Sequence, residues 1–292
     1  MSPVTERTPV PLPSGVSLEQ VNGTEALVID TPAARAVLHL DGAHLTSWTP
    51  AGEQDVLWLS ELSEYGDGAA IRGGIPLVGP WFGPGRSGDK PVKHGWIRNH
   101  PWELTEASFD GKDVVLELAL VDADPSGGGL RADARFRIGA ELSVDLTLTA
   151  GAQEVEVEAA LHTYLAVADV RELRIHGLQG ADYLDNTQAL AEDRQEDTAL
   201  ELTGPTDRIY SVNSEVRIED VAGGRSIVSC PRGTAKTVVW NPWPELAAGM
   251  ADMPDDAWTS FVCVEPAVAK ESAQVLRSGG ALTIGVTYRV ER

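Results

Sequence analysis

The stretch that decides the fold is ARFRIGAELSVDLTL, residues 134–148. Its apolar positions are even-numbered over a long run: Phe136, Ile138, Ala140, Leu142, Val144, Leu146 and Leu148. A period of two puts alternate side chains on one face of an extended backbone, so the pattern indicates a strand with one buried face. We therefore predict an extended strand over residues 134–148.

Shorter segments with strand character lie on both sides of this stretch. We expect strands or strand pairs at residues 16–29, 36–48, 55–60, 114–121, 155–161, 170–175, 209–218, 226–229, 237–240, 260–264 and 282–290. No segment shows a 3.6-residue amphipathic period, and turn signals such as Asn22-Gly23 separate the strands. This combination predicts an all-β fold, an antiparallel sandwich or barrel. Without a linker or repeat, we expect one domain over residues 16–292, after a disordered lead-in over residues 1–15.

Composition narrows the range of partners. The 292-residue chain is 42% hydrophobic, carries a net charge of −21 and has no apolar run of the ~18 residues that a membrane span needs. Its acidic balance argues against nucleic acid, because a phosphate backbone demands a broad basic face. The N-terminus lacks the pattern of a secretory signal. Cys230 and Cys263 are the only cysteines, and we expect two buried thiols, with a disulfide as the alternative.

One basic segment contrasts with the acidic chain. Residues 70–104 read AIRGGIPLVGPWFGPGRSGDKPVKHGWIRNHPWEL, and between Arg72 and Arg98 five basic residues stand against one acid, a local balance of +4. Prolines and glycines break this segment, so we expect loops that display charged and aromatic side chains. A cationic island of this size suggests a small anionic ligand, with a solvated basic loop as the alternative.

Several ordered motifs carry a family resemblance. They are IRGGIPLVGPWFGP (71–84), KHGWIRNHPWEL (93–104), LHTY (161–164), GLQGADYLDNT (177–187), VVWNPWPELAAGMADM (238–253) and SFVCVEPA (260–267). Together they resemble the aldose 1-epimerase-like superfamily, and more narrowly its hexose-6-phosphate mutarotase (glucose-6-phosphate 1-epimerase) branch, over residues 36–268. The resemblance implies a large β-sandwich of the galactose-mutarotase type with the sugar on a concave sheet face.

The resemblance implies two catalytic residues. His162 in LHTY matches the general acid, and Glu265 in CVEP matches the general base. By parity His162 shares the polar side with Glu154, Glu156 and Glu158, so we expect it to face a groove or solvent. Considered alone, it is as well explained by a structural role, and Glu265 by an exposed strand end. The family pattern continues with Gly after the Pro, where this chain has Ala267.

The resemblance also implies substrate-binding residues. Arg72, His94 and Arg98 match substrate-contact positions, and Lys93 adds a charge where relatives are often neutral. Structural alternatives are that Arg72 braces the GGIP turn and that Arg98 pairs with an acid such as Glu103.

Two further segments match sugar-contact positions. Asp185 matches an aspartate that binds sugar hydroxyls, although Asp182 is close enough to be mistaken for it and a turn role is the simpler alternative. Trp240 or Trp243 can offer an indole face to the sugar or pack in the core.

The expected activity is interconversion of the α and β anomers of a hexose 6-phosphate, with glucose 6-phosphate as the first candidate. The alternatives are a non-catalytic carbohydrate-binding protein, an aldose 1-epimerase acting on free hexoses, and a glycoside hydrolase using Asp185 with Glu265. We expect no cofactor and no metal. A sugar phosphate is the expected partner, without nucleic acid or membrane, and the expected form is a cytoplasmic monomer.

Overall fold

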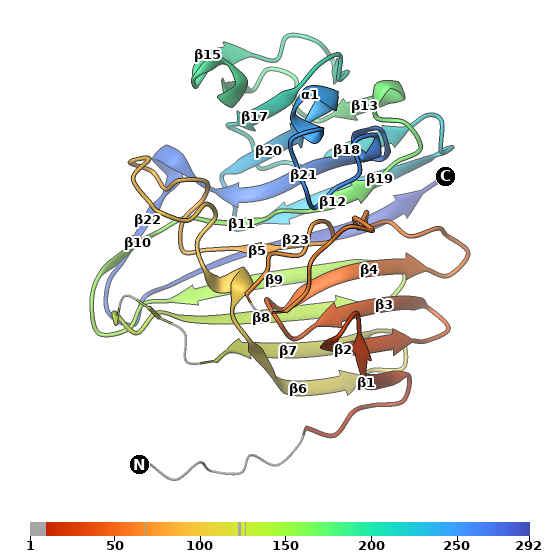
Figure 1. Ribbon diagram of the computed structural model, residues 1–292, viewed down its shortest axis with the longest axis vertical. Coiled ribbons are helices and arrows are strands. Elements are labelled where there is room, and N and C mark those ends of the chain that lie inside the picture. Colours follow the sequence, from red (N-terminus) through yellow and green to blue (C-terminus); the bar gives the residue numbers. More distant parts are fainter. Residues whose placement is uncertain (1–9, 67, 122–123, 126) are drawn as a thin grey trace.

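The computed structural model describes residues 10–66, 68–121, 124–125 and 127–292. Within these residues the chain consists mainly of antiparallel strands, arranged as two large stacked sheets (Figure 1). The expected all-β antiparallel sandwich is confirmed. Residues 1–9 of the expected lead-in lie outside the described residues, and the single domain over residues 16–292 stays a prediction.

The larger sheet, among the described residues, has nine strands in the order β16-β13-β18-β19-β23-β9-β8-β7-β6. Their bounds are β6 (Trp102–Phe109), β7 (Val114–Leu120), β8 (Arg131–Ile138), β9 (Leu142–Thr149), β13 (Leu173–His176), β16 (Ala199–Leu200), β18 (Val216–Asp220), β19 (Arg225–Arg232) and β23 (Ala281–Glu291). The long strand β23 pairs with β9 on one side and with β19 on the other. It therefore joins the meander of β6 to β9 to strands from the second half of the chain.

The opposing sheet has eight strands within the described part of the chain. Seven follow the order β15-β14-β17-β20-β21-β11-β5, and β12 also pairs with β21. Their bounds are β5 (Leu77–Val78), β11 (Ala159–Leu161), β12 (Tyr164–Ala166), β14 (Asp182–Asp185), β15 (Ala191–Arg194), β17 (Thr206–Tyr210), β20 (Lys236–Asn241) and β21 (Phe261–Val268). This sheet carries most of the side chains discussed below.

A four-stranded meander extends the second layer. It contains β1 (Val16–Val21), β2 (Thr24–Asp30), β3 (Ala34–His39) and β4 (His44–Pro50). An isolated bridge joins Leu45 of β4 to Ile75, two residues before β5 of the eight-stranded sheet. Figure 1 shows the meander lying over β6 to β9, and the Trp48 indole N–H donates to the carbonyl of Gly139 across the two layers, at 3.0 Å.

The remaining elements are short. They are the pair β10 (Val155–Val157) and β22 (Gln274–Leu276), the helix α1 (Trp243–Ala247), and the 3-10 turns η1 (Ile97–Asn99), η2 (Val170–Glu172), η3 (Asn186–Gln188), η4 (Ala257–Ser260) and η5 (Lys270–Ser272). None of the helices in the described residues has the length and apolar character that crossing a membrane requires. Both cysteines are free; Cys263 is buried as expected, whereas the expectation of a buried thiol was wrong for Cys230, which is half-buried.

Residues 134–148 form two strands, β8 and β9, and the prediction of one strand was wrong. The chain reverses at residues 139–141, and Ile138 pairs with Leu142. Because these paired residues differ by an even number, even-numbered side chains stay on the same buried face after the reversal. Ala140 continues the pattern in sequence but is exposed in the turn. The alternation therefore identified the buried face correctly and concealed the turn.

Four other expected strands also differ from the structure. Residues 55–60 form no strand and make only isolated bridges, from Leu57 to Leu165 and from Leu59 to Gly73. Residues 170–175 begin as η2 before β13, and residues 209–218 divide between β17 and β18, which belong to different sheets. Residues 155–161 are interrupted at Glu158. Parity placed this residue on the polar side, but its carboxylate is buried and accepts the backbone N–H groups of Phe82, at 3.1 Å, and Lys270, at 2.7 Å. These two hydrogen bonds explain how a charged side chain is accommodated there.

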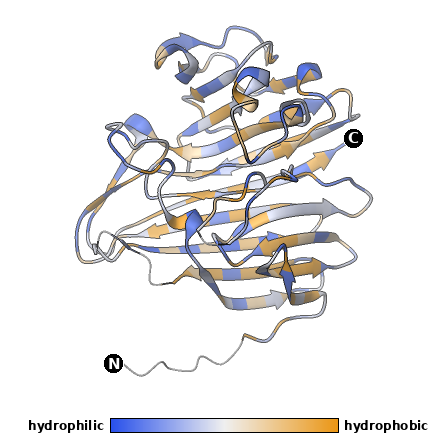
Figure 2. Cartoon of the chain, viewed as in Figure 1, coloured by the Kyte–Doolittle hydropathy of each residue, from blue (hydrophilic) through white to orange (hydrophobic). Residues whose placement is uncertain are grey.

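The two faces of the eight-stranded sheet have different surroundings. Val239 and Val264 belong to the core shared with the nine-stranded sheet, whereas Val238 packs in a separate small cluster with Val78 and Ile209. Figure 2 shows apolar and polar residues mixed along the strands. Directly paired residues of antiparallel strands share a face, and Glu265 pairs with Val238. Glu265 therefore points away from the shared core.

Candidate active site

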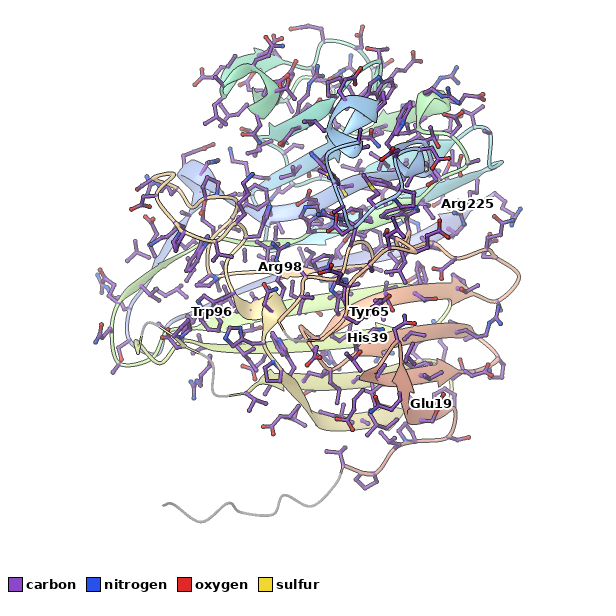
Figure 3. All side chains as sticks on the ribbon, viewed as in Figure 1. Glu19, His39, Tyr65, Trp96, Arg98 and Arg225 are labelled. Carbon is purple, nitrogen blue, oxygen red and sulfur yellow. The ribbon has the colours of Figure 1, made fainter. Side chains whose placement is uncertain are left out.

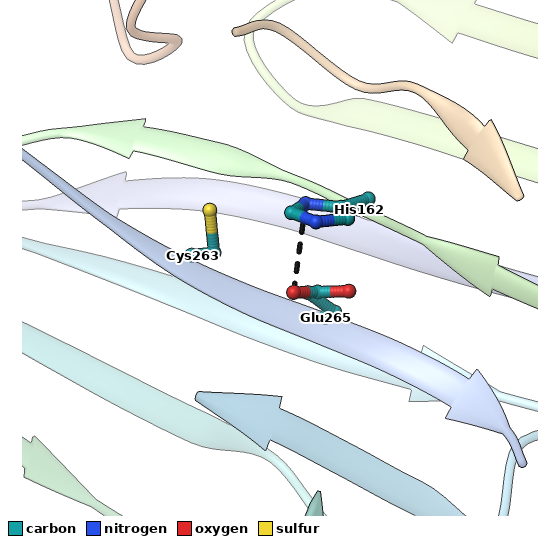
Figure 4. A group of neighbouring side chains, drawn as sticks. All are labelled: His162, Cys263 and Glu265. Atoms are coloured by element: carbon teal, nitrogen blue, oxygen red, sulfur yellow. Dashed lines mark ion pairs between the residues drawn. The ribbon is translucent and has the colours of Figure 1, made fainter. Parts of the chain in front are cut away.

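His162 and Glu265 meet on this outer face. His162 follows β11 directly and precedes β12, and both of these short strands pair with β21, which carries Glu265. The His162 Nδ1 atom lies 3.5 Å from Glu265 Oε1 (Figure 4). Only 8% of His162 and 1% of Glu265 are exposed. Among the described residues, neither His162 Nδ1 nor Glu265 Oε2 has a hydrogen-bond partner, so both remain available to a ligand.

Burial moves the pKa values of this pair in opposite directions. It raises the pKa of Glu265 well above its usual value, and the nearby Asp207 carboxylate adds to the effect, whereas Arg98 opposes it. Burial also lowers the pKa of His162 well below its usual value, helped by His94, Arg98 and Arg72. Both shifts favour uncharged forms in the free protein. Groups displaced in this way are common among residues that exchange protons with a substrate.

Arg72 is held beside the pair by two partners. Its Nε and Nη2 atoms contact Asp252 Oδ2 at 3.0 and 2.9 Å, and its Nη1 atom donates to the hydroxyl of Tyr164 at 2.9 Å. Its backbone N–H and carbonyl both bond to the Ser63 hydroxyl. The backbone of Arg72 is thus held by Ser63, while its guanidinium contacts Tyr164, whose ring stacks on His162.

His94 reaches the same group from the loop that follows β5. Its ring contacts the His162 ring edge-on, with centroids 5.3 Å apart, and the ring of Phe82 at 5.0 Å. Its Nδ1 atom accepts the Gly83 N–H at 3.4 Å, which leaves Nε2 as the protonated nitrogen of a neutral ring. Burial, Arg98 and Lys93 lower the pKa of His94 to about 3. The next residue, Gly95, permits this packing, because a Cβ there would overlap the Gly79 carbonyl.

Arg98 lies on η1, near the centre of the view in Figure 3. Its Nη2 atom donates to the Lys93 carbonyl at 3.1 Å, and its buried Nε has no partner among the described residues. The charge of Arg98 acts on the pKa values of His94, His162 and Glu265. Lys93 is exposed. The structure thus gathers Arg72, His94 and Arg98 around the His162–Glu265 pair, with Lys93 at the outside.

Trp240 and Asp207 complete this face. Asp207 pairs with Trp240, which pairs with Cys263 two residues before Glu265, so the three side chains share the face of Glu265. The Trp240 ring contacts the His162 ring at 6.1 Å. Burial raises the pKa of Asp207, although its Oδ1 atom accepts from Asn186 at 2.7 Å. Sequence reasoning missed Asp207, since only the strand register reveals its face.

The structure does not bring Asp185 into this group. Asp185 pairs with Arg208, and Arg208 pairs with Val239, so Asp185 lies on the opposite face from Glu265. Its carboxylate accepts the Thr187 N–H at 2.9 Å and contacts Arg208 at 3.4 Å. These contacts match the turn role named above as the simpler alternative. Trp243 also lies outside the group, because its ring packs on Trp258 at 4.6 Å.

Cys263 lies close to the pair. Ligand atoms of His162, Cys263 and Glu265 are all within 4.8 Å of one another (Figure 4), a donor set that zinc accepts in proteins. Burial raises the pKa of the Cys263 thiol well above its usual value. The guanidinium of Arg72 acts electrostatically on His162 and Cys263, and that of Arg98 acts on His162 and Glu265, in an environment that favours an anion over a cation. We therefore assign no metal to this trio.

Comparison with known proteins identifies the family. The aldose 1-epimerase family model matches residues 25–289. A relative in Escherichia coli strain K12, named "Putative glucose-6-phosphate 1-epimerase", is 36% identical over 267 residues, which cover 90% of this chain and 89% of the relative. The chain therefore belongs to the aldose 1-epimerase family, and the resemblance seen in the sequence is confirmed.

Solved structures agree with this assignment. The crystal structure of a "putative mutarotase" from Salmonella typhimurium aligns with a TM-score of 0.88 and 31% identity, over 97% of each chain. A galactose mutarotase-like protein from Clostridium acetobutylicum aligns with a TM-score of 0.69 over 95% of this chain and 98% of its own, at 13% identity. The second likeness concerns the fold alone.

Proposed function

We propose that this protein interconverts the α and β anomers of a hexose 6-phosphate, with glucose 6-phosphate as its substrate. The observation that carries the proposal is the buried His162–Glu265 pair, 3.5 Å apart, with two arginines beside it. An acid and a base in contact suit ring opening, and the cationic side chains suit a phosphate. Two relatives named "Putative glucose-6-phosphate 1-epimerase" support the choice of substrate.

The proposed reaction uses one acid and one base. The Glu265 carboxylate takes the proton of the anomeric hydroxyl while the His162 imidazolium gives a proton to the ring oxygen, and the C1–O5 bond breaks. The aldehyde turns about the C1–C2 bond, and O5 attacks its other face. His162 then recovers the O5 proton, and Glu265 returns a proton to O1. The pair carries one proton throughout, on His162 before opening and on Glu265 in the open-chain state.

The burial of the pair supports this cycle. Protonated Glu265 with neutral His162 is the form that the pKa shifts favour, and it is also the form required while the sugar ring is open. The enzyme therefore stabilises the state of its own side chains that accompanies the high-energy sugar species. Proton transfer in both directions then needs only the two residues and the sugar.

The proposed phosphate site consists of Arg72 and Arg98, with Lys93 adding charge and His94 shaping the site. A guanidinium stays charged and can donate two hydrogen bonds to phosphate oxygens. Arg98 supports this role because its buried Nε has no partner among the described residues. Arg72 is bonded to Asp252 and Tyr164, so it contributes the guanidinium hydrogens that these two partners leave free.

The proposed sugar contacts are the Trp240 indole face and the Asp207 carboxylate. Both lie on the face of Glu265, and an aspartate suits sugar hydroxyls because it accepts their hydrogen bonds. Asp207 replaces Asp185 in this role, since Asp185 lies on the other face. The monomeric state and the cytoplasmic location stay predictions.

Anomer-exchange NMR tests the proposal directly. We expect the purified protein to accelerate exchange between the anomeric signals of glucose 6-phosphate, and to act less on glucose. His162→Asn and Glu265→Gln serve as inactive controls, and the exposed neighbour Glu156→Gln serves as an active one. Acceleration of free glucose equal to that of the phosphate ester would favour an aldose 1-epimerase. Binding of the sugar without any acceleration would favour a carbohydrate-binding protein and overturn the proposal.

A further inference from the structure

Tyr164 touches both parts of the proposed site. Its hydroxyl oxygen accepts a hydrogen bond from Arg72 Nη1 at 2.9 Å. Its ring lies almost parallel to the imidazole of His162, with centroids 5.0 Å apart and planes inclined by 10°. Only 2% of Tyr164 is exposed. One side chain therefore contacts both Arg72, a proposed phosphate-binding residue, and His162, the proposed general acid.

The surroundings of Tyr164 fix its position. Its ring packs against Phe261 at 5.3 Å, Trp58 at 5.8 Å and Trp240 at 6.0 Å. Its backbone is part of β12. This strand pairs with β21, which carries Glu265. A ring enclosed by three aromatic side chains has little rotational freedom. Its hydroxyl and its face can therefore serve as fixed references for neighbouring groups.

Arg72 needs such a reference because arginine is long and flexible. Asp252 holds one edge of the guanidinium through Nε and Nη2, and Tyr164 holds Nη1. With two anchors the plane of the guanidinium is defined, and its remaining hydrogens have a fixed direction. Asp252 alone would leave the group free to rotate about its contacts, and ordering it would then cost binding free energy.

We propose that Tyr164 is a positioning residue that sets the distance and orientation between phosphate recognition and proton transfer. Its hydroxyl orients Arg72 toward the 6-phosphate, and its ring sets the plane of the His162 imidazole. A phosphate held by Arg72 then places the ring oxygen of the same sugar at a fixed distance from His162. This inference rests on the proposed function and adds to it a residue, Tyr164, that couples phosphate binding to proton transfer.

Two substitutions separate the two roles. Tyr164→Phe removes the acceptor and keeps the ring, so it releases Arg72 and leaves the stack with His162. Tyr164→Leu removes both. Tyr210→Phe is the matched control, because Tyr210 is also buried and its hydroxyl donates to Gln195 at 3.2 Å on the opposite face of the sheet. The control measures what the loss of any buried tyrosine hydroxyl does to the protein.

For Tyr164→Phe we expect KM for glucose 6-phosphate to rise about tenfold, with a smaller change in kcat, because one hydrogen bond to a charged group is lost. The Kd of glucose 6-phosphate, measured by calorimetry, should rise in parallel. For Tyr164→Leu we expect kcat to fall as well, since the imidazole loses its support. Tyr210→Phe should match the wild type in KM and kcat, whatever its Tm.

A double-mutant cycle decides whether Tyr164 acts through Arg72. In an Arg72→Ala background, Tyr164→Phe should add almost nothing to the rise in Kd, because the group it orients is gone. Additive effects, or an unchanged KM and Kd in Tyr164→Phe, would overturn the inference. Failure of the proposed function looks different: the wild type itself would show no exchange with glucose 6-phosphate. The calorimetric cycle then still tests whether Tyr164 orients Arg72 for phosphate. If Tyr164→Leu does not fold, Tyr164→Phe and the cycle carry the decision.

Discussion

The His162 Nδ1 atom and the Glu265 Oε1 atom are 3.5 Å apart, beyond the distance of a good hydrogen bond, and both residues are buried. The two groups come from adjacent strands, at the break between β11 and β12 and at the middle of β21. Neither atom is therefore committed to a short hydrogen bond with the other. This relationship leads to the first prediction.

His162→Asn and Glu265→Gln should each lower kcat for anomer exchange by ~10² to 10⁴-fold, the usual contribution of an acid–base group. Both changes preserve shape, so both variants should remain folded. The double variant should lose far less than the product of the single losses, because the two groups act in one cycle. Anomer-exchange NMR measures all three rates. A folded single variant with a normal rate would remove that residue from the mechanism.

The pKa of Glu265 gives a prediction about stability. Because burial raises this pKa above the unfolded value, the contribution of Glu265 to stability is fully present below about pH 4.5 and is lost as pH rises through the folded pKa. The glutamine side chain in Glu265→Gln does not titrate. Over that window the stability of the variant relative to the wild type should therefore increase with pH, by roughly 1.4 kcal/mol per unit.

Urea denaturation between pH 4 and pH 8 checks this expectation. The matched control is Glu156→Gln, an exposed carboxylate on β10 that pairs with Arg86. A difference between the wild type and Glu265→Gln that stays constant across the range would show that Glu265 ionises normally in the folded protein.

The arginines should determine the preference for phosphorylated sugars. Arg98→Ala and Arg72→Ala should each weaken the binding of hexose 6-phosphates by about 2–5 kcal/mol, and Lys93→Ala by less, because Lys93 is exposed. Turnover of free glucose should fall much less. Arg86→Ala is the control, since Arg86 lies on the same basic segment but pairs with Glu156 at 2.8 Å. Equal losses on both sugars at a normal Tm would contradict the phosphate assignment.

Asp207 and Asp185 form a pair of contrasting substitutions. Asp207→Asn should raise KM for glucose 6-phosphate and for glucose alike, because the sugar ring is common to both. Asp185→Ala should leave KM unchanged and lower stability by about 0.5–2 kcal/mol, because it removes the side chain that caps η3 by accepting the Thr187 N–H. Kinetics and thermal unfolding of the two variants measure both effects. A raised KM in the Asp185 variant, with a normal KM in Asp207→Asn, would restore Asp185 to the site.

Much of the fold was predictable because burial imposes a period of two on a strand. The alternation in residues 134–148 gave the buried face correctly, and its failure at the turn has a specific cause: Ile138 pairs with Leu142, so parity survives the reversal. The family motifs led to His162 and Glu265, which the structure brings together.

The position of the aspartate was not predictable, because it depends on strand register. Asp185 and Asp207 both lie in short strands of suitable polarity, and sequence gives no way to choose the face of either. Only the pairings of Asp207 with Trp240 and of Asp185 with Arg208 assign them to opposite faces. In the same way, no local signal indicated that Glu158 would be buried. Its carboxylate accepts hydrogen bonds from two segments that are distant in the sequence.

The alternation along β20 has a consequence for how this protein can diverge. Val239 faces the shared core, while its neighbours Val238 and Trp240 face the proposed site. A substitution at one position therefore alters the interior of the sandwich, and a substitution at the next alters the face of the proposed sugar site. Descendant sequences can explore new substrates at even-numbered positions of this strand while selection for folding acts on its odd-numbered ones.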